Sequence, residues 1–330
     1  MDRKKIRVCL IYHKSNIFLT GKYFDNTYYH FFITSLKRNK DLELQLIPTD
    51  DVFDFSKLRG KYDIILLWDN GPFGMPKNMQ DIKEIEIPII SRVTDYGTKG
   101  QKSAKKLREL NEKCGIDYYF DFVPEDYFHE HYPDNFKYKT IIFGLESSLY
   151  NNLKPFDERI KDRILLTGAI GNKKFFSKII NDIKRPKWNA YRFYNLRTKC
   201  SDLPYVDYTP TLQHHYVNDR YPQLLEQYAS SIVATTYVPN IKYWENAAAG
   251  CLTFMEITKS NRGDFLGYRD GESCIFIDQK NYKRKLEEYL ADPENPKWKE
   301  IANAGREFTL QNYTNDKAVD SLVELMRTLI

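Results

Sequence analysis

A short segment near residue 240 carries residue types that could bind an anion beside a hydroxyl group. Residues 241–249 are rich in alanine and predict a helix, with Asn240 as its N-cap and Gly250 just past its end. The first free N–H groups of a helix attract phosphate. Lys242 lies in the first turn, and Glu245 follows one turn later. A phosphate at the helix start with a carboxylate for a ribose hydroxyl is typical of a nucleotide site. The alternative is a solvent-facing lysine and glutamate on an ordinary helix.

An upstream loop offers a second element for phosphate. Residues 163–167 form a short apolar run that predicts a strand, and Gly168 opens the glycine-containing loop that follows. Lys173 and Lys174 stand at the start of a helix predicted over 173–184. A strand, a glycine loop and two lysines at a helix start predict an electropositive nest for phosphate. A glycine turn with solvated lysines is the alternative, and the spacing does not match the P-loop of an ATPase.

Further basic residues follow that helix. Arg197 and Lys199 come after a run over 188–194 that predicts another strand, and they could add phosphate contacts.

Polar residues follow three predicted strands in the N-terminal half. His13, Asp69 and Asp95 each stand just after one of these strands. Because the carboxyl ends of parallel strands meet at one edge of a sheet, we expect the three side chains to face one site. Asp95 and His13 are the candidates for the general base of a group transfer, with Asp69 behind them. An aspartate that caps a turn, or an ordinary loop histidine, explains each of them equally well.

Strands that alternate with helices would position these residues. We predict strands over 6–12, 42–47, 62–68, 87–93, 116–122 and 139–143, then over 163–167, 188–194, 232–236, 251–256 and 274–277, with some strand character over 206–216. We predict helices over 25–38, 99–113, 173–184, 241–249, 281–291, 296–311 and 316–329. This alternation predicts an α/β fold with buried parallel sheets. The loop after the first strand has no GxGxxG, which disfavours a dinucleotide site there.

Length and charge limit the classes of function. A chain of 330 residues is long enough for two domains of ordinary size. Its 50 basic and 45 acidic residues give a formal net charge of +5, which suits an enzyme with anionic substrates. It lacks the clustered basic stripe of a DNA-binding domain, so we expect no nucleic-acid partner. The basic helix over 99–113 could touch an acidic membrane surface, although a solvated charged face explains it as well.

Cysteines and histidines give no sign of a metal site. The five cysteines show no CxxC spacing, and His129, His131, His214 and His215 lack the spacing of a zinc site. We therefore expect no metal and no cofactor. Reduced, buried thiols indicate a cytoplasmic protein. The first residues read as a strand and not as a signal peptide, and no apolar run approaches the length of a membrane span.

Three segments in the C-terminal half resemble the nucleotide-sugar half of GT-B glycosyltransferases, in the group 1 or family 4-like branch. They are residues 221–236 (YPQLLEQYASSIVATT), 242–250 (KYWENAAAG) and 266–278 (LGYRDGESCIFID), in the order that the family has them. Glu245 matches the second of two glutamates that many members carry. Tyr237 stands in the position of the first, and this departure leaves the stereochemical outcome open.

The resemblance implies two Rossmann-like domains that face a central cleft. We expect an acceptor-binding domain over 1–148, a linker over 149–160 and a nucleotide-sugar-binding domain over 161–312. The last helix, over 313–330, would cross back to the first domain. The resemblance also implies a glycosyltransferase of polysaccharide biosynthesis that needs no metal. It would move a sugar from a nucleotide-diphosphate donor to a glycan, a lipid-linked or another acceptor.

The resemblance assigns roles to individual residues. Glu245 would hold the ribose hydroxyls. The diphosphate would lie on the N–H groups of Asn240, Ile241 and Lys242, near Tyr237 and the loop at Gly168, with Lys173, Lys174 and Lys242 as cations. In the acceptor domain the family often has a His-Asp pair, of which only Asp95 carries over. Two alternatives remain, namely a nucleotide-sugar epimerase on the same fold and a non-catalytic sugar- or nucleotide-binding protein.

Overall fold

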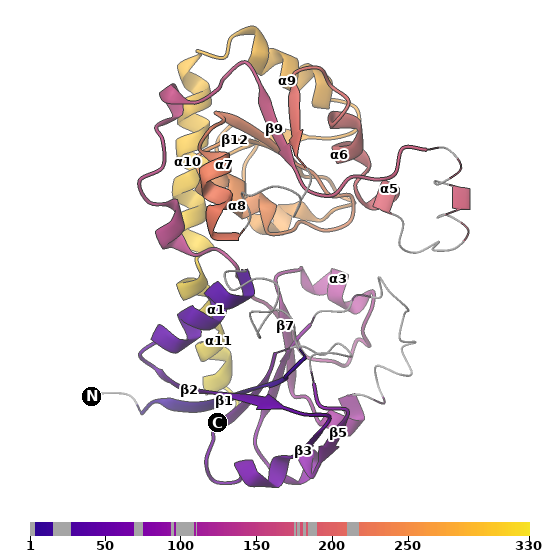
Figure 1. Cartoon of the computed structure of the whole chain (residues 1–330), viewed down its shortest axis with the longest axis vertical. Helices are drawn as coiled ribbons and strands as arrows, with labels where there is room; N and C mark the ends of the chain where they lie inside the picture. Colours follow the sequence, from indigo (N-terminus) through magenta and orange to yellow (C-terminus); the bar gives the residue numbers. More distant parts are fainter. Residues whose placement is uncertain are drawn as a thin grey trace. The chain divides into compact units, whose positions relative to one another are not determined.

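The computed structural model describes residues 4–15, 28–68, 75–93, 96, 109, 111–174, 176, 179–180, 183, 190–209 and 218–330. The chain forms two compact units (Figure 1). Unit 1 contains Met1–Gly144 and Asn315–Ile330, and unit 2 contains Leu145–Thr314. Each unit is built around its own parallel sheet.

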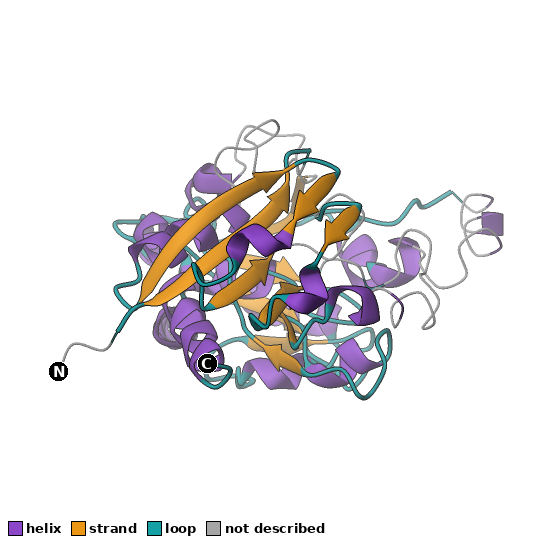
Figure 2. Cartoon of the chain, turned by 90° about the horizontal axis from the view of Figure 1, so that it is seen from below, coloured by secondary structure: helices purple, strands orange, loops and turns teal. Residues whose placement is uncertain are grey.

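Unit 1 contains a twisted sheet with six strands in its described part, in the order β2-β1-β4-β6-β7-β8 (Figure 2). All neighbouring pairs are parallel. The strands are β1 (Ile6–His13), β2 (Leu42–Thr49), β4 (Ile64–Leu67), β6 (Ile89–Arg92), β7 (Tyr118–Asp121) and β8 (Tyr138–Thr140). Each predicted apolar run in this half therefore forms a strand, and the parallel α/β class is confirmed.

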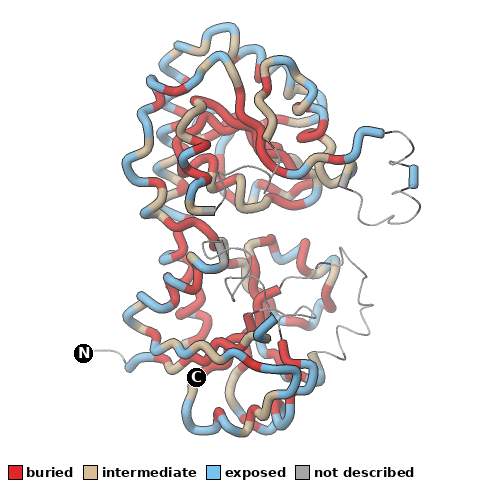
Figure 3. The backbone as a smooth tube through the Cα atoms, in the orientation of Figure 1, coloured by how far each residue is buried: buried red, intermediate tan, exposed pale blue. Residues whose placement is uncertain are grey.

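Helices pack their apolar stripes on this sheet. In the described part of unit 1 they are α1 (Tyr28–Arg38), α3 (Glu125–His129) and α11 (Asn315–Arg327). Ala318, Leu322 and Leu325 of α11 join one buried cluster with β1, β4 and α1. Asn315 accepts a hydrogen bond from the N–H of Gly144 at 2.6 Å. The last helix of the chain thus completes the core of unit 1, where burial is concentrated (Figure 3).

A small second sheet in unit 1 was not predicted. Strands β3 (Val52–Asp54) and β5 (Asn78–Gln80) pair in parallel, and the 3-10 helices η1 (Phe55–Leu58) and η2 (Ile82–Glu84) follow them. Strands of three residues are too short to show a hydrophobic period. Most of the basic helix predicted over 99–113 lies outside the described residues, although residues 109 and 111–113 are helical.

Unit 2 is a smaller doubly wound sheet. Its described strands are β9 (Ile164–Thr167), β10 (Val206–Thr209), β11 (Ser230–Val233), β12 (Leu252–Glu256) and β13 (Ile275–Ile277). They lie in the order β10-β9-β11-β12-β13, and all pairs are parallel. From β9 the chain adds β10 on one side and then crosses to β11 on the other. The strand order therefore reverses between β9 and β11, which is where open α/β sheets bind their ligands.

The described helices of unit 2 include the three that were predicted over 241–249, 281–291 and 296–311. They are α5 (Ala190–Phe193), α6 (Asn195–Cys200), α7 (Tyr221–Leu225), α8 (Lys242–Ala248), α9 (Tyr282–Ala291) and α10 (Pro296–Asn312), with the 3-10 helices η3 (Ser147–Tyr150), η4 (Phe156–Glu158), η5 (Asn218–Arg220) and η6 (Gly263–Leu266). The strand predicted over 188–194 is wrong, because residues 190–193 form α5. Its aromatic residues favour a strand, but the chain is helical here and leads directly into α6, whose Leu196 and Cys200 are buried in the core.

Candidate functional site

The switch point of unit 2 is lined by the two segments that the sequence singled out. Gly168 directly follows β9, and its φ of 108° lies in the left-handed region that favours glycine. Residues 234–241 connect β11 to α8. The glycine loop and the head of α8 therefore lie at the carboxyl ends of neighbouring strands. This is the geometry that the sequence pattern predicted for the two elements.

The head of α8 is capped by its own chain. The side chain of Asn240 accepts a hydrogen bond from the N–H of Lys242 at 3.1 Å, and the carbonyl of Ile241 accepts one from the N–H of Glu245 at 3.0 Å. Asn240 is therefore not the N-cap, which is Ile241, but its side chain still binds the first N–H group of the helix, which begins at Lys242. At seven residues α8 has a short dipole. The positive charge at this edge therefore comes mainly from side chains.

Lys242 and Glu245 form a half-buried ion pair above a tyrosine ring. The Nζ atom of Lys242 lies 3.2 Å from Oε2 of Glu245, and the two side chains are 19% and 13% exposed. The same Nζ atom lies 3.2 Å from the centroid of the Tyr221 ring. The Tyr221 hydroxyl bonds to Thr167 at 2.7 Å and donates to Asn246 at 3.0 Å. Tyr221 thus ties the end of β9 to α8 beneath the ammonium group.

Burial lowers the pKa of Lys242. Loss of hydration is the largest cause, Glu245 opposes it, and the positive charge of Arg197 lowers this pKa further. Arg197 therefore acts electrostatically on Lys242 although the two residues belong to different helices. Two cations at the switch point repel each other, which favours an anion between or beside them.

Arg197 is a buried guanidinium with unused hydrogen-bonding capacity. Its side chain lies on α6, and the residue is 2% exposed. Nη1 donates to the carbonyl of Ala169 in the glycine loop at 3.2 Å, and the guanidinium lies 4.7 Å from the ring centroid of Tyr194. Within the described part of the chain, Nε and Nη2 have no hydrogen-bond partner. Burial lowers the pKa of Arg197. Because a buried charge without a partner is costly, an anionic ligand would stabilise this guanidinium.

The glycine loop is held tightly against the helix that carries Tyr191. The N–H of Gly171 donates to Thr198 at 2.9 Å, and a Cβ atom at Gly171 would lie 2.3 Å from the Cα atom of Tyr191. Lys173 forms an ion pair with Asp202, and Lys174 is exposed. No contact among the described residues joins either lysine to Lys242. Lys173 is therefore already paired with a carboxylate, and Lys174 is open to solvent.

Two more residues lie at the same edge, one on a loop and one at a strand end. Tyr237 is exposed, with its ring centroid 5.6 Å from that of Phe193. Glu256 ends β12 and is buried. Burial raises the pKa of Glu256 to about 7, the charge of Arg197 opposes this rise, and Asp278 adds to it. The sequence predicted neither a role for Glu256 nor the burial of Arg197, because burial depends on tertiary packing.

In unit 1, the structure describes one of the two candidate bases. His13 ends β1, where its Nδ1 atom lies 2.5 Å from Oγ of Ser15 and its Nε2 atom lies 3.1 Å from Oδ1 of Asp51. Asp51 also accepts a hydrogen bond from Lys77 at 2.8 Å. The second candidate, Asp95, and the reserve candidate, Asp69, lie outside the described residues.

Neither a metal cluster nor a membrane span is found in the described parts of the chain. Among those residues, no three His, Cys, Asp or Glu side chains come together as a cation site. No described helix combines the length and the apolar character needed to cross a bilayer.

The chain is similar to known glycosyltransferases in sequence and in structure. Residues 161–324 match the model of the family described as glycosyl transferase-like. The structure resembles Anabaena HepE in complex with UDP and glucose (10% identity, TM-score 0.57, covering 98% of this chain and 100% of that one). It also resembles an α-glucosyltransferase in complex with UDP-glucose and DNA containing an abasic site (12% identity, TM-score 0.58, 98% and 100%). Sucrose-phosphate synthase from Thermosynechococcus elongatus is similar at 12% identity and TM-score 0.57, over 99% of both chains. No curated protein is significantly similar in sequence.

The structural similarities establish the fold, which is GT-B with two parallel α/β sheets. The class of protein is therefore that of nucleotide-sugar-dependent glycosyltransferases. Within that class, residues 161–324, just under half of the chain, match the glycosyl transferase-like family, and the enzyme is family 4-like. The family, the fold class and the enzyme class predicted from the sequence are confirmed.

Proposed function

We propose that unit 2 binds a nucleoside diphosphate sugar at the switch point between β9 and β11. The observation that carries the proposal is the pair of cations there, the buried Arg197 and the half-buried Lys242. Arg197 has two nitrogen atoms without a partner in the described structure and no carboxylate within ion-pair distance among the described residues. A diphosphate supplies the negative charge that both cations need.

Glu245 would hold the sugar part of the nucleotide. Its carboxylate is half-buried beside Lys242, so it can accept hydrogen bonds from ribose hydroxyls once a phosphate engages the ammonium group. Asn240, Ile241 and Tyr237 line the approach to this position, and Gly168 leaves room for a phosphate close to the backbone. Lys173 and Lys174 would add only long-range attraction.

The arrangement favours departure of the nucleoside diphosphate. Negative charge grows on this leaving group as the bond to the sugar breaks, and cations fixed in place stabilise that charge most in the transition state. Arg197 and Lys242 carry enough positive charge for this role, and we propose a reaction that does not depend on a metal ion. UDP is the first nucleotide to test, because HepE and the α-glucosyltransferase were solved with UDP or UDP-glucose.

We propose that unit 1 is the acceptor-binding domain. Its predicted bounds are 1–148, followed by a linker over 149–160, and the last helix, over 313–330, crosses back to it. His13 and Asp95 remain our candidates for a base that activates the acceptor hydroxyl. His13 is oriented on both ring nitrogens by Ser15 and Asp51, which would hold it ready for proton transfer. The acceptor would be a glycan or a lipid-linked sugar, as in polysaccharide biosynthesis. The five free, buried cysteines support a cytoplasmic location.

The direct test is release of nucleoside diphosphate from a panel of UDP-, GDP- and ADP-sugars, with and without EDTA. We expect one donor to be turned over slowly in water and faster when glycan acceptors are added. EDTA should leave the rate unchanged. Glu245→Ala should abolish turnover, and Glu288→Ala, a surface change in the same unit, should not. If the Glu245→Ala variant still turns over every donor, the proposal is contradicted.

A further inference from the structure

Residues 172–190, called the excursion below, join the glycine loop to α5 in the sequence. The two ends of this segment are adjacent, because Gly171 packs directly against the backbone of Tyr191. The hydrogen bond from Gly171 to Thr198 fixes the ends to α6. None of the residues of the buried cluster of unit 2 comes from the described part of the excursion. The parallel sheet therefore does not need this segment for its core.

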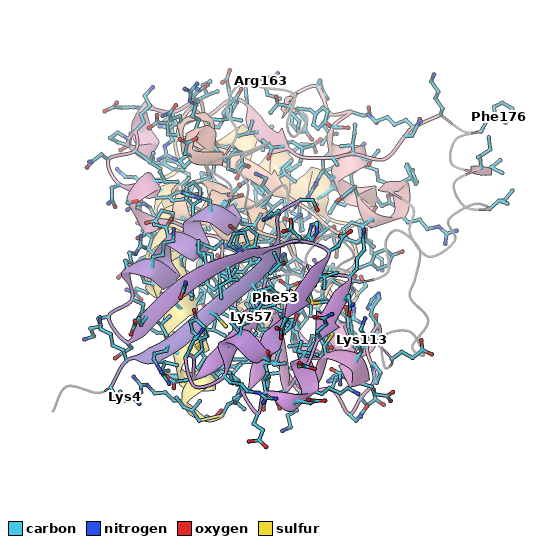
Figure 4. The ribbon with its side chains drawn as sticks, turned by 60° about the horizontal axis from the view of Figure 1, so that its bottom comes forward. Lys4, Phe53, Lys57, Lys113, Arg163 and Phe176 are labelled. Carbon is cyan, nitrogen blue, oxygen red and sulfur yellow. The ribbon has the colours of Figure 1, made fainter. Side chains whose placement is uncertain are left out.

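The excursion carries an exposed apolar face, which we call the 176–183 ridge. It consists of four helical residues at spacings of three, four and seven, namely Phe176, Ile179, Ile180 and Ile183. Their exposed fractions are 77%, 41%, 49% and 75%. Phe176 lies away from the sheet of unit 2 (Figure 4). The apolar spacing that usually faces a core thus faces outward here.

The surroundings of the ridge are strongly basic in sequence. Residues 172–188 contain six of the 50 basic residues of the chain and only one of its 45 acidic residues. The rest of the chain therefore has 44 of each and is formally neutral, so this short segment holds the whole net charge of +5. Lys173 and Lys174 are exposed at its start, and Lys173 has a partner in Asp202. Charge and apolar surface occur together in one segment.

We propose that the 176–183 ridge docks the protein on an anionic lipid surface. A helix with phenylalanine and isoleucine on one face and lysines around it is the pattern that lies in a membrane interface. The apolar side chains enter the acyl boundary while the basic residues meet anionic headgroups. A second copy of the chain fits less well, because a symmetric contact would place five net positive charges opposite five others.

The ridge is tethered next to the loop at Gly168 and Gly171. Membrane docking through the ridge would hold unit 2 at the lipid surface without involving its parallel sheet. The inference stands on exposure and charge and does not depend on the proposed donor. Its failure would leave the cations at the switch point untouched.

The test is co-sedimentation of the full chain with vesicles. One set contains phosphatidylcholine alone, and the other contains phosphatidylcholine with about one-third phosphatidylglycerol. We expect binding to the anionic vesicles that is at least about tenfold stronger than binding to the neutral ones, and that weakens at about 0.5 M salt. The double variant Ile179→Ser, Ile183→Ser should lose this binding. Val52→Ser, which changes an exposed valine of unit 1, should keep it.

Melting temperatures and light scattering complete the experiment. Equal melting temperatures for the double variant and the unchanged chain would show that lost vesicle binding comes from the ridge and not from unfolding. Equal binding by both proteins, or no binding to anionic vesicles, would overturn the inference. A dimer that the double variant abolishes, together with absent vesicle binding, would assign the ridge to self-association instead.

Discussion

Lys242 and Glu245 stand three positions apart on α8, and their charged groups are 3.2 Å from each other. In the free protein the carboxylate and the Tyr221 ring share the ammonium group. A phosphate that approached Lys242 would compete with Glu245 and release its oxygens toward a neighbouring hydroxyl. We propose that the pair links recognition of the phosphate to recognition of the ribose.

Removing the charge of Glu245 should weaken the donor more than it weakens the fold. For Glu245→Gln we expect a loss of nucleoside diphosphate affinity of roughly 10- to 100-fold, since a hydrogen bond to a charged group contributes about 1.5–3 kcal/mol. Calorimetric titration measures it, and Glu288→Gln on α9 is the matched control. An unchanged affinity in Glu245→Gln would remove this residue from the site.

Arg197 should be required for ligand binding and dispensable for stability. A buried cation without a counter-charge is costly, and an apolar residue of similar length avoids that cost. We expect Arg197→Met to keep or raise the melting temperature of the free protein and to lose the temperature shift that a nucleoside diphosphate causes. Arg284→Met, on the surface of α9, should leave both unchanged. A strong loss of stability with an intact ligand shift would indicate a structural role.

Glu256 should make stability depend on pH. Burial raises its pKa from 4.5 to about 7, so between these values the folded protein holds a proton that the unfolded chain releases. The stability that this proton gives is present below about pH 4.5 and is lost as the pH rises through about 7. We therefore expect Glu256→Gln to stabilise the protein by about 1–3 kcal/mol at about pH 8 and by little at about pH 5. Denaturant unfolding at both values checks it, and a constant difference between the two proteins at both pH values would refute the assignment.

Gly171 should not tolerate a side chain. A methyl group there would lie 2.3 Å from the Cα atom of Tyr191, and backbone cannot move aside as a side chain can. Gly171→Ala should cost about 1–3 kcal/mol of unfolding free energy. Lys174→Ala, at a nearby exposed position, should change it by less than about 0.5 kcal/mol. If the two variants unfold at the same denaturant concentration, the close approach of loop and helix is not as described.

Hydrophobic periodicity and composition predicted the strands and helices whose burial follows a regular local pattern. The apolar runs that became β1 and β9 and the alanine-rich α8 were readable because burial and period agree in each. α5 was misread because its aromatic residues favour strands, and its four residues are too few to show a helical period. The three-residue strands β3 and β5 carry no period to read.

The site shows the same division. Glu245, Lys242 and the loop at Gly168 were found because each lies in a short motif. Arg197 stood out in the sequence only as a basic residue after a run misread as a strand. Its burial and its bond to Ala169 depend on contacts between segments 28 residues apart. The outward face of the 176–183 ridge could not be predicted either, because helical spacing alone does not tell a core face from a surface face.

The central claim is that the cations and Glu245 at the switch point of unit 2 bind a nucleoside diphosphate. A thermal-shift titration of UDP, GDP, ADP and CMP, with and without EDTA, tests it most directly. The account predicts a rise in melting temperature with one nucleoside diphosphate, unchanged by EDTA, and absent in both Glu245→Ala and Arg197→Met. No rise with any of them, or an equal rise in both variants, would contradict it.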